Sequence, residues 1–140
     1  MIYHQIRFSV KPDVPPEELE ASLERLRTLG RELDVVESWV VGRDFGGEFE
    51  YGALYALPDI EAYRTYMYAP LHLETDAAGL PLVNNFVSQD LTDDPDPAIG
   101  DKIAEVHRDR FADHPEVLEL VANLGSYTGS GVPDDVSASR

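Results

Sequence analysis

The chain has no cysteine among its 140 residues, which excludes disulfide bonds and thiolate chemistry. Positive charge is also scarce: 11 lysines and arginines stand against 27 aspartates and glutamates, for a formal net charge of -16. A field of this sign repels nucleic-acid phosphates and anionic lipid, so we expect neither nucleic acid nor a membrane as a partner. No apolar run approaches the roughly 18 residues of a membrane span, and no leader-like segment precedes the first strand, which predicts a cytoplasmic protein.

Motifs for common bound groups are missing as well. The sequence contains no HExxH or Cys/His zinc pattern, and no glycine-rich loop between a strand and a helix that would hold phosphate. His107 and His114 lie near acidic residues, but Pro115 interrupts the helical face that they would need to share. We therefore predict no metal and no cofactor, with a haem ligated by His72 as the weaker alternative.

Length and composition indicate one domain with a substantial core, since 43% of the residues are hydrophobic. An acidic, proline-containing linker near residue 94 divides the chain. We predict a main domain over residues 1–94 and an amphipathic helical extension over 95–126. Residues 127–140 are rich in glycine, serine and aspartate, and we expect them to form a disordered tail.

Hydrophobic periodicity and turn residues predict the order strand, helix, strand, strand, helix, strand. The expected strands are 2–10, 35–41, 49–57 and 81–91; the expected helices are 16–29, capped by Gly30, then 60–68 and 71–79, separated at Pro70. This order predicts an α+β, ferredoxin-like βαββαβ antiparallel sheet with its helices on one face. Two further helices, 98–112 and 115–124, carry too many apolar residues to remain in water, so we expect them to pack on the core or on a second copy.

One histidine lies in the buried row of the first strand. Strand side chains alternate, so His4 shares a face with Ile6 and Phe8. A neutral imidazole in an apolar pocket can act as a general base, or it can simply donate a hydrogen bond to a backbone carbonyl. The spacing alone does not separate these two interpretations.

The opposite face of the same strand carries polar side chains. Tyr3, Gln5, Arg7 and Ser9 point away from the predicted helices. A small sheet with one uncovered face often pairs with a second copy, and this pattern predicts a homodimer through the sheet.

A second histidine follows the helix break at Pro70. His72 lies in the first turn of the next helix, where the helix dipole lowers the pKa of an imidazole. Tyr66 precedes it by six residues and would face the same cavity. Together they form a workable acid–base pair, in which one group takes a proton and the other steadies an enolate oxygen. The alternative is a histidine that only stabilises the helix junction.

Several of these segments, in this order, resemble the Dabb family of stress-responsive α/β-barrel domains over residues 1–91. The resemblance rests on His4, Lys11-Pro12-Asp13-Val14, Pro16-Glu17-Glu18-Leu19, Val41-Gly42-Arg43-Asp44 and Ala69-Pro70-Leu71-His72. It implies a dimeric α/β barrel and polyketide cyclisation of the olivetolic acid cyclase type, with His72 as the base, Tyr66 assisting and His4 in the pocket. The chain departs from the family pattern at Ala69 and Tyr51, where the family or that cyclase has histidine.

From the residues and the resemblance we expect a proton-transfer enzyme, namely a cyclase, isomerase or lyase, acting on a small carbonyl or polyketide-like substrate. The predicted catalytic residues are His72, Tyr66 and His4. The predicted substrate-binding residues are Ile6, Phe8, Leu23, Tyr51, Tyr63 and Met67. Two alternatives remain: a binding or stress-response protein without turnover, and an accessory subunit of a biosynthetic enzyme.

Overall fold

The computed structural model of the chain describes residues 1–131. Its elements run in the order β1 (Ile2–Val10), α1 (Pro16–Glu32), β2 (Ser38–Arg43), β3 (Tyr51–Leu57), α2 (Ile60–Tyr68), α3 (Pro70–Gly79), a 3₁₀ turn η1 (Leu80–Leu82), β4 (Val83–Thr92), α4 (Ile99–Asp113), α5 (Pro115–Ala122) and β5 (Ser126–Gly129). The fold is mixed α+β, as predicted. None of the helices within residues 1–131 is long and apolar enough to cross a bilayer.

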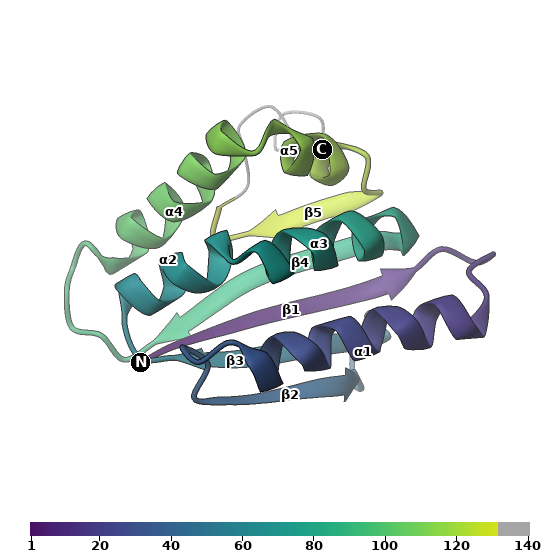
Figure 1. Cartoon of the computed structure of the whole chain (residues 1–140), viewed down its shortest axis with the longest axis horizontal. Coiled ribbons are helices and arrows are strands. Elements are labelled where there is room, and N and C mark those ends of the chain that lie inside the picture. Colours follow the sequence, from purple (N-terminus) through teal and green to yellow (C-terminus); the bar gives the residue numbers. More distant parts are fainter. Residues whose placement is uncertain (132–140) are drawn as a thin grey trace.

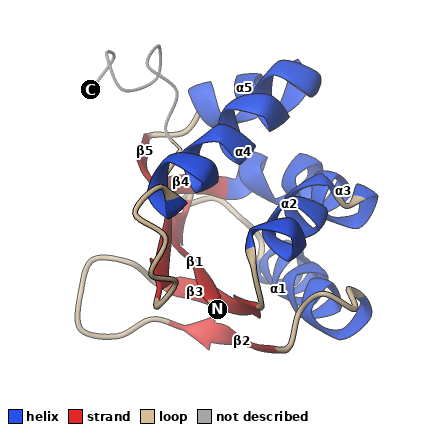
Figure 2. Ribbon diagram, turned by 90° about the vertical axis from the view of Figure 1, so that its left-hand side faces the viewer, coloured by secondary structure: helices blue, strands red, loops and turns tan. Residues whose placement is uncertain are grey.

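The strands form one open sheet in the order β2-β3-β1-β4-β5. β1 lies in the centre and pairs antiparallel with both β3 and β4. The helices cover one face of this sheet, and the other face is bare (Figure 2). His4, Ile6 and Phe8 of β1 are buried on the covered face, which confirms the predicted alternation.

Local signals account for most helix boundaries. Asp59 caps α2 by accepting a hydrogen bond from the backbone N–H of Ala62 at 2.8 Å. Pro70 and Pro115 each occupy the first turn of a helix, where a missing N–H costs nothing, and so they start α3 and α5. The predicted breaks at both prolines are confirmed.

The structure corrects two predicted boundaries in the first half of the chain. Gly30 does not cap α1, which continues to Glu32; it is a buried residue whose missing side chain leaves room for the Trp39 ring. The hairpin strand predicted at 35–41 is β2, which begins at Ser38 and extends through Gly42. Strand pairing with β3 overrides the turn that the glycine suggested.

The C-terminal extension packs on the same protomer, against α2 and α3 and along the β4–β5 edge of the covered sheet face (Figure 1). Its buried apolar residues are Ile103, Val106, Phe111, Val117, Val121 and Leu124, and Tyr127 of β5 is buried directly after them. The prediction of two packed helices is confirmed. The prediction of a disordered tail from residue 127 is wrong for its first residues, since β5 pairs parallel with β4 and buries Tyr127. The rest of that tail, residues 132–140, lies outside the described residues.

Candidate active site

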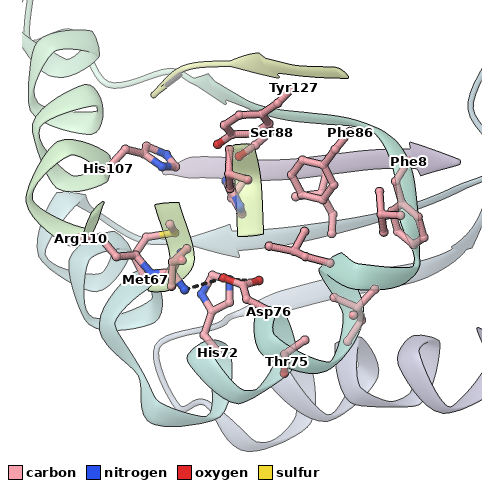
Figure 3. A pocket seen from close by; sticks show the side chains of 18 of the residues that line it. Phe8, Met67, His72, Thr75, Asp76, Phe86, Ser88, His107, Arg110 and Tyr127 are labelled. Atoms are coloured by element: carbon pink, nitrogen blue, oxygen red, sulfur yellow. Dashed lines mark hydrogen bonds and ion pairs between the residues drawn. The ribbon is translucent and has the colours of Figure 1, made fainter. Parts of the chain in front are cut away.

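A cavity of about 80 Å³ lies between the covered face of the sheet and the helices. The predicted residues Ile6, Phe8 and Met67 line it, together with all three predicted catalytic residues. Figure 3 shows an apolar end near Phe8 and Phe86, and a polar end where side chains of α3 and α4 meet. The small volume suits a compact ligand.

The other three predicted substrate-binding residues lie outside the cavity wall. Leu23 is buried in the core between α1 and the sheet. Tyr51 packs its ring against Phe8, with the ring centroids 5.9 Å apart. Tyr63 takes part in a hydrogen-bond network behind His4, described below.

His72 and Tyr66 are adjacent, as the sequence predicted. Their ring centroids are 4.5 Å apart, because the break at Pro70 turns α3 back against the end of α2. The Nδ1 of His72 lies 3.1 Å from the backbone oxygen of Tyr66. A carbonyl only accepts, so Nδ1 carries the proton and Nε2 carries the lone pair. His72 therefore presents a basic nitrogen.

The Nε2 of His72 faces a charged pair. It lies 3.6 Å from Oδ1 of Asp76, one helical turn along α3. The other carboxylate oxygen of Asp76 accepts a hydrogen bond of 2.6 Å from the Nη2 of Arg110 on α4. Asp76 therefore joins the candidate base to the C-terminal extension, and its carboxylate is placed to stabilise a protonated His72.

His4 is held by a second carboxylate. Its Nδ1 lies 2.8 Å from Oδ1 of Asp90 on β4, and both side chains are 2% exposed. Burial would raise the pKa of Asp90, but the charge and hydrogen bond of His4 outweigh burial and hold that pKa below its ordinary value. The ionised Asp90 thus orients the imidazole whose other edge lines the cavity.

Tyr63 extends this network to the extension. Its hydroxyl donates to Oδ2 of Asp90 at 3.0 Å and lies 2.7 Å from Nε2 of His107 on α4. Because the phenol has one proton and gives it to Asp90, Nε2 of His107 must be the donor to the phenol oxygen. His107, Tyr63, Asp90 and His4 therefore form one continuous chain of hydrogen bonds.

Burial sets the protonation states of the ring side chains. It lowers the pKa of His72 to about 4, with Arg110 and His4 adding to the shift and Asp76 opposing it. It likewise lowers the pKa of His107 to about 4. Burial raises the pKa of the Tyr66 phenol well above its ordinary value. At neutral pH, His72 is a free base and Tyr66 a hydrogen-bond donor.

Four ionisable residues of this site are not among those predicted from the sequence: Asp76, Asp90, His107 and Arg110. Asp76 is predictable from the sequence, because it follows His72 by four residues on a helix and therefore lies on the same helical face. The sequence suggests a role for His107 only together with His114, which is a more exposed residue at the end of α4. Within residues 1–131, no three histidine or acidic side chains come together to hold a metal ion.

Comparison with known proteins identifies relatives of this fold. The model of the stress responsive A/B barrel domain family, Dabb, matches residues 2–93. A dimeric ferredoxin-like protein of unknown function from Thermobifida fusca is 21% identical, covers 65% of this chain and 89% of its own, and has a TM-score of 0.59. No curated protein matches the chain.

Two structural neighbours are named as enzymes. Hydroxynitrile lyase from Passiflora edulis is 14% identical, covers 67% of this chain and 94% of its own, and has a TM-score of 0.61. SnoaB, a cofactor-independent oxygenase from Streptomyces nogalater, is 20% identical, covers 69% of this chain and 96% of its own, and has a TM-score of 0.55. At these identities the likeness concerns the fold.

Proposed function

The chain belongs to the Dabb family of stress-responsive A/B barrel domains, and from this premise we propose that it is a cofactor-independent enzyme that transfers protons on a small carbonyl substrate. One observation carries the proposal: a neutral, buried His72 with an unprotonated Nε2 lies against Tyr66 on the wall of a cavity. Cyclase, isomerase and lyase reactions share this first step, the removal of a proton next to a carbonyl.

In this mechanism Nε2 of His72 takes the proton from the carbon next to the carbonyl. Asp76, 3.6 Å away, stabilises the imidazolium that forms. The carbonyl oxygen becomes an enolate, which accepts a hydrogen bond from the Tyr66 hydroxyl. Tyr66 lines the same cavity as His72, so its hydroxyl can face the substrate. His4, oriented by Asp90, binds the substrate from the sheet side.

Hydrogen–deuterium exchange tests this role before the natural substrate is known. A panel of small methyl ketones and keto acids is incubated with the protein in D₂O, and loss of the proton signals next to the carbonyl is followed by NMR. The wild type should accelerate exchange for at least one member. His72→Gln should lower that rate by about 100-fold or more, and Tyr66→Phe by about tenfold or more.

The matched control is His114→Gln, because His114 is a histidine of the extension that lies outside the cavity wall. It should exchange at the wild-type rate. If no panel member exchanges faster with the wild type than with His72→Gln, the protein is not a proton-transfer enzyme for this class. Saturable binding without exchange would then support the ligand-binding alternative.

A further inference from the structure

Arg110 is the only lysine or arginine that is fully buried within residues 1–131. It comes from α4, in the extension that lies outside the region matched by the family model. Its guanidinium points from α4 toward Asp76 and His72 at the polar end of the cavity (Figure 3). Burying a charged guanidinium is costly unless anionic groups accept its hydrogen bonds. The chain has a net charge of -16, so most of its other charged groups are anionic.

The hydrogen bonds of Arg110 are incomplete. A guanidinium has five N–H groups, and the only hydrogen bond this one makes to the described residues is from Nη2 to Asp76. The buried Nε has no partner. A buried donor without an acceptor is costly, and it is rare in folded proteins unless a ligand or water completes it.

A second incomplete polar group lies on the same cavity. Within residues 1–131, two buried side-chain atoms lack a hydrogen-bond partner: Nε of Arg110 and Oγ of Ser22 on α1. Both residues line this one cavity, which is otherwise walled mainly by apolar side chains. The wall therefore offers a cation, a hydroxyl and an apolar surface to one small molecule.

We propose that Arg110 is the carboxylate-binding residue of this cavity and that the substrate is a small keto acid. Its carboxylate would bind the N–H groups of Arg110 that Asp76 leaves free, because a guanidinium matches a carboxylate in geometry and charge. Its apolar carbons would lie against the aromatic end, and a further oxygen would accept from Ser22. This substrate class rests on the proposed proton-transfer function, since the carboxylate would hold the carbonyl beside His72.

Binding of two probes of nearly equal shape tests this without requiring turnover. Levulinate carries a methyl ketone and a carboxylate; 2,5-hexanedione replaces the carboxylate with a second methyl ketone. Calorimetric titration of the full-length wild type should show levulinate binding at least about tenfold more tightly than the dione. Equal affinity for the two probes, or no saturable binding of levulinate, would overturn the proposal.

Variants then assign the effect to Arg110. Arg110→Gln should reduce levulinate affinity at least about tenfold and leave the dione within about twofold, whereas Arg110→Lys should lose less because it keeps the charge. Ser22→Ala should weaken both probes alike. Arg64→Gln is the matched control, because Arg64 also forms an ion pair between α4 and a neighbouring helix, through Asp109, but does not line the cavity. Unchanged levulinate affinity in a folded Arg110→Gln protein would contradict the assignment.

The two proposals fail in different ways. Levulinate binding that depends on Arg110, without exchange of any proton next to a carbonyl, would support the carboxylate site and contradict the proposed enzymatic function. Exchange of neutral ketones at wild-type rates in Arg110→Gln, with no preference of the wild type for levulinate, would support the proton-transfer function and contradict a keto acid substrate.

Discussion

Two of the arginine–aspartate pairs in this protein, Arg7–Asp44 and Arg110–Asp76, use the same groups differently. On the bare sheet face, Arg7 donates through Nε and Nη2 to both oxygens of Asp44, at 2.7 and 2.9 Å. In the cavity, Arg110 donates through Nη2 alone to one oxygen of Asp76, while the other oxygen faces His72. The first pair is internally complete; the second leaves N–H groups and a carboxylate oxygen directed at the site.

Burial makes this difference consequential. Arg7 is 30% exposed, and water can solvate whatever Asp44 does not. Arg110 is 5% exposed, and its buried Nε has no hydrogen-bond partner among the described residues. An ion pair at the surface commonly leaves donors that water satisfies. A buried pair that leaves a donor without an acceptor indicates a binding site for a ligand or an ordered water. The same contrast separates the two faces of the sheet, one bare and one enclosing the cavity.

The largest expected effect comes from removing the extension that encloses the cavity. Truncation after Asp94 deletes seven buried apolar residues, each worth about 1.5–3 kcal/mol when buried, and uncovers the network around His4. Because the truncated protomer loses this burial, we expect it to melt at a clearly lower temperature than the full chain. Thermal denaturation measures this. A melting curve identical to that of the full chain would mean that the extension serves an outside partner instead.

The two ion pairs should respond unequally to the same substitution. Asp76→Asn leaves a buried guanidinium without its counter-charge and should cost about 3–5 kcal/mol. Asp44→Asn removes a partly exposed pair and should cost about 1 kcal/mol or less. Urea denaturation of both variants gives the comparison. Equal losses would show that the cavity pair is as well solvated as the surface pair.

Acid should destabilise the covered face before the bare one. The folded-state pKa values of His72 and His107 are about 4, below the ordinary 6.5, so the unfolded chain binds more protons between these values. Stability should fall as pH drops from 6.5 to 4, by up to roughly 3 kcal/mol for each histidine. Asp90, with its lowered pKa, extends this loss to lower pH.

Denaturation at a series of pH values checks this. His107→Gln should flatten the slope between pH 6.5 and 4, whereas His114→Gln, at a more exposed position, should keep it. The same slope in His107→Gln and the wild type would mean that His107 is already solvated in the folded protein.

The smallest effect on protomer stability is expected on the bare face. Leu91 is 74% exposed on this side of the sheet and is the register partner of the partly exposed Tyr3. Val40, on β2, is 60% exposed on the same face. Structural neighbours of the fold are described as dimeric, and we expect this face to form the dimer. Leu91→Asp should weaken dimerisation at least about tenfold in sedimentation and change protomer unfolding by less than about 0.5 kcal/mol. An unaltered dimer would place the interface elsewhere.

Much of the fold was predictable because its signals are local. Alternation along β1 placed His4 on the buried face, and prolines 70 and 115 marked helix starts. Two wrong predictions, the cap at Gly30 and the disordered tail from residue 127, arose because they used neighbouring residues alone. Gly30 resembled a cap because nothing nearby in sequence reveals Trp39, and β5 resembled a tail because its polar residues pair by backbone hydrogen bonds that composition does not report.

The sequence by itself determined the element order, the core face of β1 and the approach of Tyr66 to His72, since these depend on neighbours a few residues apart. The tertiary structure alone decided the partners of the site. His4 meets Asp90 across 86 residues, Tyr63 meets His107 across 44, and Arg110 meets Asp76 across 34. Such contacts depend on strand register and on where the extension packs, which periodicity does not specify.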